Sequence, residues 1–344
     1  MRPFLALVLT ACSTPAPTPE VEPEPAPQPE PLVQVDPAHQ VLFAAIEAAP
    51  QKHSNLSPEV LAARIDLGKT LYYDARLSAT DTISCNSCHQ LDSYGVDGEP
   101  TSPGITGDRG GRNSPTVYNA AVHVAQFWDG RAEDVEAQAK GPILNPIEMG
   151  MPGEGEVLAK LGAIPGYGPL FLAAFPDAEV QITYDNLADA IGAFERTLVT
   201  PSRFDDYLQG DATALTAEER ASLDLYVATG CTTCHLGAGL GGSMYMKLGL
   251  VQPYETEDAG RMEVTGNEAD RHVFKVPSLR NVVETGPYLH DGSIDSLEET
   301  VAIMARHQLG KELTDEEVDS IVAFLKALTG EIPEGVTTAP AMPS

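Results

Sequence analysis

The sequence is poor in basic residues, in cysteine and in segments where apolar and polar residues alternate as in β-strands. Its 21 lysines and arginines stand against 50 aspartates and glutamates, so the formal net charge is −29. This charge argues against a nucleic-acid partner, because a phosphate backbone would be repelled, and it favours a basic protein partner. Simple solubility of an acidic surface is the alternative that charge alone leaves open.

Long apolar runs are also missing, since none after the first residues approaches the ~20 residues of a membrane span. At the chain start, Met1–Arg2 precedes an apolar segment, and Leu9–Thr10–Ala11–Cys12 resembles a bacterial lipobox. We therefore expect a lipoprotein signal peptide over residues 1–11 and a lipid on Cys12. A spare thiol behind a misassigned start is the alternative. The processed protein would be periplasmic and anchored by lipid, in the outer membrane if the source is Gram-negative.

Composition divides the rest of the chain into further segments. Residues 12–36 are rich in proline and glutamate and poor in apolar bulk, so they predict an extended linker. The residues from 37 to 332 suffice for two domains. We place these domains at 37–205 and 206–332, because each then contains one of two cysteine motifs. The proline- and threonine-rich residues 333–344 are predicted to form a disordered tail.

Four of the five cysteines fall in two copies of Cys-x-x-Cys-His, at Cys85–His89 and Cys231–His235. This is the attachment signature of c-type haem, in which both thiols bond to the porphyrin and the histidine binds the iron. A thioredoxin-like redox motif would need a surrounding βαβ pattern, which the sequence lacks. A four-cysteine zinc site would leave both histidines unexplained. The sequence therefore predicts two covalently bound haem c groups.

Helix signals dominate the two predicted domains. Pro58 follows Ser57 at the start of an apolar segment and suits the first turn of a helix. Apolar residues recur with helical spacing in residues 184–198 and 318–328. Capping boxes predict helix starts at Thr216…Glu219, Ser296…Glu299 and Thr314…Glu317. We therefore predict an all-α fold of two cytochrome c-like domains, with one c-type haem each.

Several further motifs occur in a fixed order around the two haem motifs. They are Asn113–Ser114–Pro115–Thr116, Gln126–Phe127–Trp128–Asp129–Gly130–Arg131, Gly141–Pro142, Pro146–Ile147–Glu148–Met149, Val276–Pro277–Ser278–Leu279–Arg280–Asn281 and Gly286–Pro287–Tyr288–Leu289–His290–Asp291–Gly292. In this order the chain resembles the bacterial di-haem cytochrome c peroxidase family, from about residue 57 to 330. The resemblance implies an enzyme that reduces hydrogen peroxide to water. Its electrons would come from a small cytochrome c or a cupredoxin, and the family commonly forms homodimers.

The resemblance also implies roles near the first haem, which His89 would bind and where peroxide would react. Glu148 matches the family's pocket carboxylate, which can move a proton between the two peroxide oxygens. Gln138 matches a pocket amide that orients peroxide or water, and Trp128 matches the aromatic residue between the haems. The alternatives are a helix-start glutamate, a helix-surface glutamine and a core aromatic residue.

The second haem, on His235, would be the electron-transfer group. Met304 lies at the family's spacing after His290, and a His/Met pair raises the reduction potential of a haem. His307, three residues further on, is a rival ligand on roughly the same helix face. Three other methionines remain alternatives: Met244, Met246 and Met262.

The family also places a calcium ion between its domains, and the matching positions are the Asn113 side chain and the carbonyls of Thr285 and Pro287. Oxygen ligands suit calcium, although an ordinary loop is the alternative for these residues taken alone. His290 is left as a structural or propionate-contacting residue. The sequence assigns no role to four other histidines: His39, His53, His123 and His272.

One departure from the family concerns the loop before Asn113, where a histidine often caps the first haem in the resting oxidised state. Ile105 stands at that position, and no histidine occurs between His89 and His123. We therefore expect the first haem to be five-coordinate or water-bound when fully oxidised, and active without prior reduction. His123 could replace the missing ligand only by moving, whereas ligands are normally pre-positioned.

Two other functions are consistent with two haems. A di-haem oxidase that acts on a protein substrate, resembling the methylamine dehydrogenase maturation enzyme, has tyrosine rather than methionine on the second haem. Met304 argues against it. A non-catalytic electron carrier needs neither a pocket carboxylate nor an open iron, so Glu148 and Ile105 argue against that function.

Overall fold

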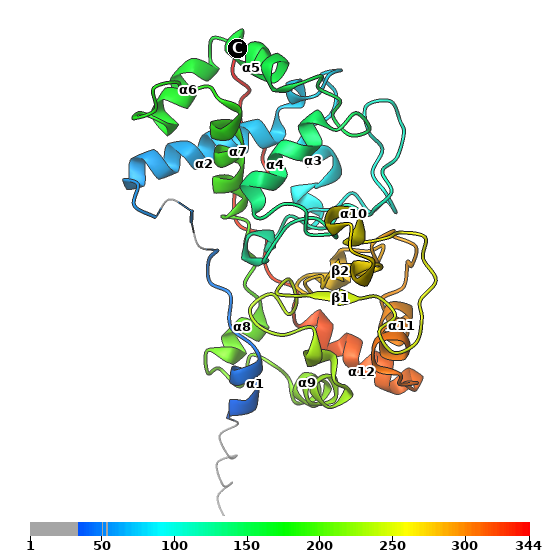
Figure 1. The fold of residues 1–344 in the computed structure, drawn as a ribbon. Helices are drawn as coiled ribbons and strands as arrows, with labels where there is room; N and C mark the ends of the chain where they lie inside the picture. The colour runs from blue at the N-terminus through cyan, green and yellow to red at the C-terminus, as the bar shows by residue number, and fades with distance from the viewer. Residues whose placement is uncertain (1–33, 50, 53) are drawn as a thin grey trace, which may run out of the picture. The chain divides into compact units, whose positions relative to one another are not determined.

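The computed structural model describes residues 34–49, 51–52 and 54–344, and residues 34–344 form one compact unit (Figure 1). The predicted signal peptide, the lipidated Cys12 and nearly all of the predicted linker lie outside the described residues. The helices are α1 (Pro37–Leu42), α2 (Pro58–Tyr73), α3 (Cys85–Cys88), α4 (Val135–Leu144), α5 (Glu154–Gly162), α6 (Tyr167–Ala174), α7 (Tyr184–Glu195), α8 (Arg203–Leu208), α9 (Ala217–Thr229), α10 (Met262–Thr265), α11 (Leu297–Leu309) and α12 (Asp315–Lys326).

The described chain is mostly helical, as predicted. Its one small sheet pairs β1 (Tyr245–Lys247) with β2 (Val273–Lys275) in antiparallel register, with Met246 opposite Phe274. Within the described residues, no single helix has the length and apolar character to cross a membrane. The helices α5 and α6 meet these criteria only when they are counted together as one bent pair, and then by length and composition alone.

The helix starts follow the capping signals of the sequence. Ser57 accepts a hydrogen bond from the Val60 amide at the start of α2, where Pro58 is the first helical residue. Complete capping boxes open α9 at Thr216 and α12 at Thr314. At α11 the Ser296 side chain accepts a hydrogen bond from the Glu299 amide, but the Glu299 side chain does not return one to the Ser296 amide, so only half of the predicted box forms.

Two large clusters of buried apolar side chains fill the two halves of the described chain. The upper half in Figure 1 is built mainly on α2, α4, α6 and α7, and the lower half on α8, α9 and α12. Phe204 of α8 lies in the lower cluster, so α8 belongs with the lower half although it begins just before residue 206. The division into two domains stays a prediction, because residues 34–344 are one compact unit.

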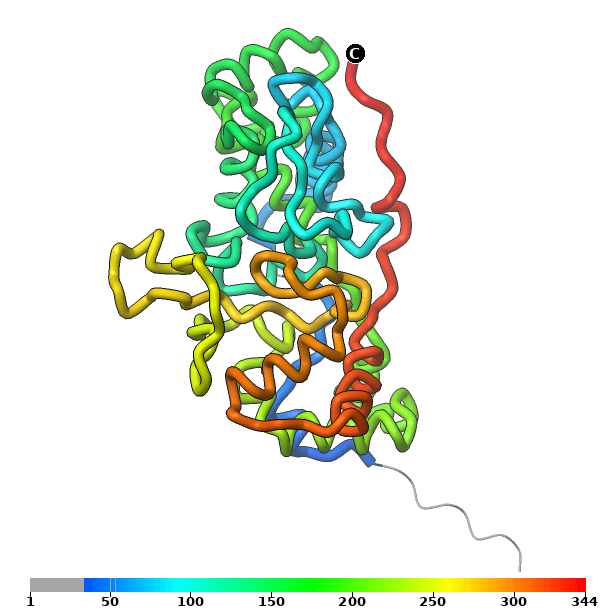
Figure 2. Tube along the Cα trace, turned by 90° about the vertical axis from the view of Figure 1, so that its right-hand side faces the viewer, coloured from blue at the N-terminus to red at the C-terminus, as the bar shows by residue number. Residues whose placement is uncertain are grey.

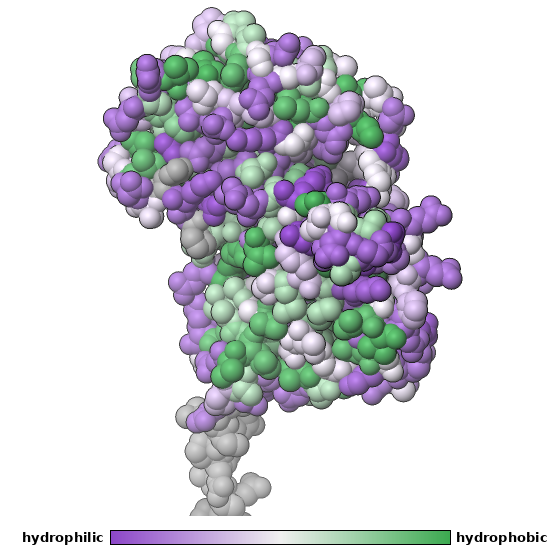
Figure 3. Space-filling model, viewed as in Figure 1, coloured by the Kyte–Doolittle hydropathy of each residue, from purple (hydrophilic) through white to green (hydrophobic). Residues whose placement is uncertain are grey.

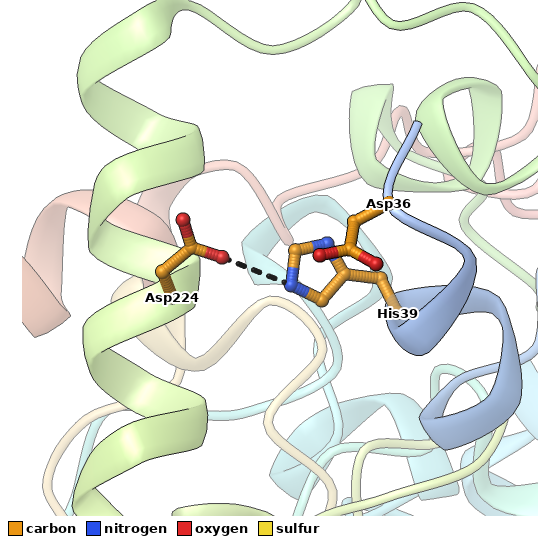
Figure 4. A group of neighbouring side chains, drawn as sticks. All are labelled: Asp36, His39 and Asp224. Carbon is orange, nitrogen blue, oxygen red and sulfur yellow. Dashed lines mark ion pairs between the residues drawn. The ribbon is translucent and has the colours of Figure 1, made fainter. Parts of the chain in front are cut away.

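The first described residues pack on the lower half and not on the upper half, to which we assigned them. Phe43 contacts the rings of Phe204 and Tyr226, which makes α1 part of the lower core. His39 of α1 is buried, and its Nδ1 lies 2.9 Å from the Tyr207 hydroxyl. Its Nε2 lies 3.2 Å from an Asp224 carboxylate oxygen (Figure 4). Both imidazole nitrogens are therefore engaged. Asp36, which caps α1, lies close to His39 and Asp224, and the contacts of His39 fasten this segment to the lower half.

The C-terminal residues are ordered, whereas their composition predicted disorder. From α12 the chain runs upward along the molecule and ends beside α6 (Figures 1 and 2). Val336 is buried in a third apolar cluster with Tyr72, and its carbonyl accepts a hydrogen bond from the Tyr73 hydroxyl at 2.9 Å. The Gly166 amide donates to the Ser344 carbonyl at 3.1 Å. One buried valine and several backbone acceptors thus replace the apolar bulk that the tail lacks.

Two loops in different halves follow the same backbone path. An isolated antiparallel bridge closes each loop, between Gln126 and Ala132 in one and between Tyr288 and Ile294 in the other. The second residue of each loop has a positive φ, 66° at Phe127 and 67° at Leu289, as does the glycine three residues later. Trp128 and His290 therefore hold equivalent places in the two loops.

The equivalence extends along the chain at a constant offset of 162 residues, the offset from Gln126 to Tyr288. Asn119 and Asn281 both have left-handed backbone geometry, and both donate to the Thr200 hydroxyl, at 2.8 and 2.9 Å. The same offset relates the first residues of α4 and α11, Val135 and Leu297. The two halves are thus an internal structural repeat that meets at Thr200. In this repeat, Pro142 of α4 stands where α11 carries Met304.

Candidate active site

The second Cys-x-x-Cys-His motif opens into a cavity of about 250 Å³ that residues of both halves line. Its walls include both motif cysteines, Cys231 and Cys234, together with His235 and Met304. The motif begins directly after α9, whose last residue precedes the left-handed Gly230. Met304 comes from α11, which faces the same cavity. Residues far apart in the sequence thus present two thiols, an imidazole and a thioether to one space.

The His235 imidazole is held in one orientation. Its Nδ1 donates to the Leu240 carbonyl at 3.1 Å, which leaves Nε2 as the free nitrogen. Burial lowers the pKa of His235, so the ring is neutral and Nε2 can bind a metal. This donor set fits a c-type haem with His/Met ligation.

Met304 and its rival His307 lie differently on α11. Met304 lines the cavity with His235, whereas His307 contacts the loop that precedes α10. The His307 Nδ1 lies 3.1 Å from the Gln252 carbonyl, and the ring packs edge-on against Tyr254. Met246 also lines the cavity, from β1. The geometry therefore favours Met304 over His307 as the ligand. It leaves Met246 as the other methionine that could supply a thioether at this site.

The first motif begins with α3 in the upper half, and His89 follows as the residue that ends this helix. Burial lowers the pKa of His89, and its buried Nδ1 has no hydrogen-bond partner among the described residues. Tyr72 donates to the His89 carbonyl at 2.7 Å, as Tyr226 donates to the His235 carbonyl at 3.1 Å. The two haem motifs are therefore supported in the same way, and this donor set also fits a c-type haem.

Glu148 faces the first haem motif from the segment after α4. Burial raises the pKa of Glu148, against the opposing charge of Arg131 and a hydrogen bond of 2.7 Å from the Asn145 amide. Burial and nearby carboxylates, Glu148 among them, raise the pKa of the Cys85 and Cys88 thiols, which places Glu148 on their side. A carboxylate with a raised pKa beside a haem site is suited to proton transfer.

Ile105 packs against the segment that carries Glu148. Its backbone amide donates to the Glu148 carbonyl at 3.0 Å, and its side chain packs over Gly150. Gly104 lets the two segments approach, since a Cβ there would lie 1.5 Å from the Ile147 carbonyl oxygen. The loop that carries Ile105 is therefore docked against the Glu148 segment and offers an apolar side chain there.

Known proteins resemble this chain over most of its length. A family model described as di-haem cytochrome c peroxidase matches residues 62–213. Over 273 residues the chain is 50% identical to the cytochrome c551 peroxidase of Nitrosomonas europaea, covering 78% of this chain and 80% of that one. The cytochrome c551 peroxidase of Pseudomonas aeruginosa is 44% identical over 309 residues, covering 88% and 89%. The chain belongs to the di-haem cytochrome c peroxidase family.

A solved structure agrees with this membership. The crystal structure of a MauG-like protein associated with microbial copper homeostasis superposes with a TM-score of 0.75 at 30% identity. The superposition covers 86% of this chain and 97% of that protein. As a member of the family, the chain is a di-haem peroxidase.

The cavity at the second haem motif is called the second cavity below. The remaining predicted residues of this peroxidase line it, except for Gln138. Trp128 lines the cavity and donates from Nε1 to the Asn113 carbonyl at 3.0 Å. Asn113, Thr285 and Pro287, the predicted calcium ligands, line the same cavity. Gln138 is half-buried on α4, and its contact with peroxide stays a prediction.

Sequence reasoning missed two groups at the contact between the halves. Arg112 binds Asp129 of the Trp128 loop and Asp258, so it ties the segment before α10 to the upper half. Lys275 and His123 form a buried contact in the second cavity. Their place in the repeat could have revealed them, because Lys275 is the equivalent of Asn113, and Thr285 is the equivalent of His123.

Proposed function

We propose that this peroxidase reduces hydrogen peroxide at a haem held by Cys85, Cys88 and His89. A second haem, held by the Cys231–His235 motif and Met304, would receive electrons from a donor protein. The bound haems supply the redox chemistry and the iron at which the O–O bond is cleaved. The internal repeat supports this assignment of different roles to the two haems, because Pro142 of α4 occupies the position that Met304 occupies in α11. The first site therefore lacks the sulfur ligand and keeps an iron position free for peroxide.

Glu148 moves the proton in this proposal. Hydrogen peroxide, two protons and two electrons give two waters, so one proton must pass from the inner to the leaving oxygen. Burial raises the pKa of Glu148, which moves its carboxyl group toward the range in which it can both accept and return a proton. Gln138 orients peroxide or water beside it. Trp128, on the loop between the halves, provides the aromatic path for electrons to the first site.

The donor is a small basic cytochrome c or a cupredoxin that docks near α11. Leu250 and Val251 are 52% and 56% exposed, and the Val251 amide donates to the carbonyl of His307, on the helix that carries Met304. Figure 3 shows apolar patches on this half of the molecule, over a surface that elsewhere is largely hydrophilic. An apolar centre within an acidic surface suits a transient complex with a basic partner.

We expect the rate of donor oxidation to fall steeply as ionic strength rises, because the −29 net charge attracts a basic donor and salt screens this attraction. The measurement is kcat/KM for reduced cytochrome c between about 10 and 150 mM salt. A small neutral electron donor serves as the control and should show little salt dependence. A basic cytochrome that reacts equally fast at both salt concentrations would contradict this docking proposal.

The proposal also includes the cellular location of the protein and a bound calcium ion. The chain works in the periplasm, anchored through Cys12, and carries calcium at Asn113, Thr285 and Pro287 between its halves. A homodimer is consistent with the family. Oxygen ligands at the wall of the second cavity support the calcium site.

The free iron position can be tested by restoring the histidine that the family often has. In an Ile105→His variant we expect a lag before peroxide turnover begins from the oxidised protein, because an imidazole can then occupy the iron. Pre-reduction of the second haem should remove the lag. An Ile105→Val variant is the matched control and should start at once, like the parent. A parent protein that already shows the lag would contradict the proposal.

A further inference from the structure

Lys275 is a buried lysine without an acidic partner. It is the last residue of β2 and is 7% exposed. Its Nζ contacts the His123 Nδ1 at 3.1 Å, and no charged partner among the described residues offsets its burial. Burial therefore lowers the pKa of Lys275 to about 8. A buried ammonium group without a counter-charge is costly, so this arrangement calls for an anion.

His123 adds a second unused donor at the same place. Because its Nδ1 accepts from the Lys275 ammonium, the neutral ring carries its proton on Nε2. This Nε2 is buried, and no acceptor among the described residues reaches it. The ring lies against Gly242, where a Cβ would come within 2.2 Å of it, so the glycine makes room for His123. An ammonium and an N–H group thus remain unsatisfied side by side.

Both residues line the cavity that contains Cys231, Cys234 and Met304. A c-type haem attached there brings two propionate carboxylates into a space whose walls are otherwise mainly apolar. We propose that Lys275, oriented by His123, binds a carboxylate of this second haem and thereby raises its reduction potential. A fixed positive charge near the iron favours the reduced form, which carries one positive charge less.

The internal repeat supports this assignment. Lys275 is the equivalent of Asn113, and the two backbone amides make the same hydrogen bond, to the Trp128 carbonyl at 2.7 Å and the His290 carbonyl at 2.8 Å. One copy of the repeat thus has a neutral amide at this position and the other has a cation. The Lys275 bond also fixes the lysine to the loop that carries Trp128, beside the electron path.

The inference rests on haem attachment at the second motif, and its test is the midpoint potential of that haem in the holo-protein. In a Lys275→Met variant we expect the equilibrium constant for reduction to fall about tenfold, which is 59 mV for one electron. Lys275→Arg keeps the charge and should retain most of the potential. Lys247→Met is the matched control, because it removes an exposed lysine from the partner strand β1 and should leave the potential unchanged.

A second variant acts through the other partner. His123→Phe keeps an aromatic ring but removes both nitrogens, and we expect a smaller decrease in the same direction, so it decides the matter if Lys275→Met does not fold. Unchanged potentials in His123→Phe and Lys275→Met proteins that retain both haems would overturn the inference. A parent midpoint that shifts with added phosphate would also overturn it, since the pair would then hold a free anion. A parent protein with a single haem would instead overturn the proposed function.

Discussion

A Glu148→Gln variant should lose peroxide turnover by about 10²–10⁴-fold, because glutamine cannot accept and return the proton that O–O cleavage requires. The isosteric amide keeps the side chain beside Asn145, so both haems should remain attached with unchanged spectra and potentials. The measurement is steady-state oxidation of reduced cytochrome c by hydrogen peroxide, with the haem potentials determined on the same preparation. Glu133→Gln is the matched control, since Glu133 is exposed in the same half.

The pH profile provides a second check on Glu148. The carboxylate acts as the initial base, so activity should fall as pH drops through the pKa of Glu148. Burial raises this pKa, which places the acidic limb at a higher pH than an ordinary glutamate would give. The limb should be absent from the residual activity of Glu148→Gln. Full activity of that variant at every pH would remove Glu148 from the mechanism.

A Met304→Leu variant should lower the potential of the second haem by an amount on the order of hundreds of millivolts, because a thioether ligand favours ferrous iron and leucine cannot replace it. Donor-driven turnover should then collapse, since the donor could no longer reduce this haem. Met246→Leu is the matched control, because Met246 lines the same cavity from β1. A potential that falls in Met246→Leu and stays unchanged in Met304→Leu would assign the ligand to Met246.

Much of this architecture is visible in the sequence because its determinants are local. Capping residues such as Ser57 and Thr314 begin the helices where the sequence places them. The haem motifs fix attachment chemistry within five consecutive residues, and the spacing from His290 points to Met304. These features depend on neighbouring residues along one helix or loop. The fold then only has to bring the segments together.

The residues that sequence reasoning missed depend on contacts across the fold. Lys275 and His123 look ordinary in the sequence, and their meaning appears only when β2 and the loop before Trp128 meet in one cavity. The tail is similar, because Val336 becomes ordered by packing beside Tyr72 rather than by its own composition. The role proposed for Pro142 follows from the internal repeat, which the backbone geometry of the two halves makes evident.

In the proposed mechanism the first haem is open to peroxide in the resting enzyme. Its most direct test is peroxide-dependent oxidation of reduced cytochrome c, started with fully oxidised, calcium-loaded protein and recorded from the first turnover. We expect the full rate at once, because Ile105 and Pro142 offer no ligand to the iron. A lag that pre-reduction removes would contradict it, since another group would then cap the iron.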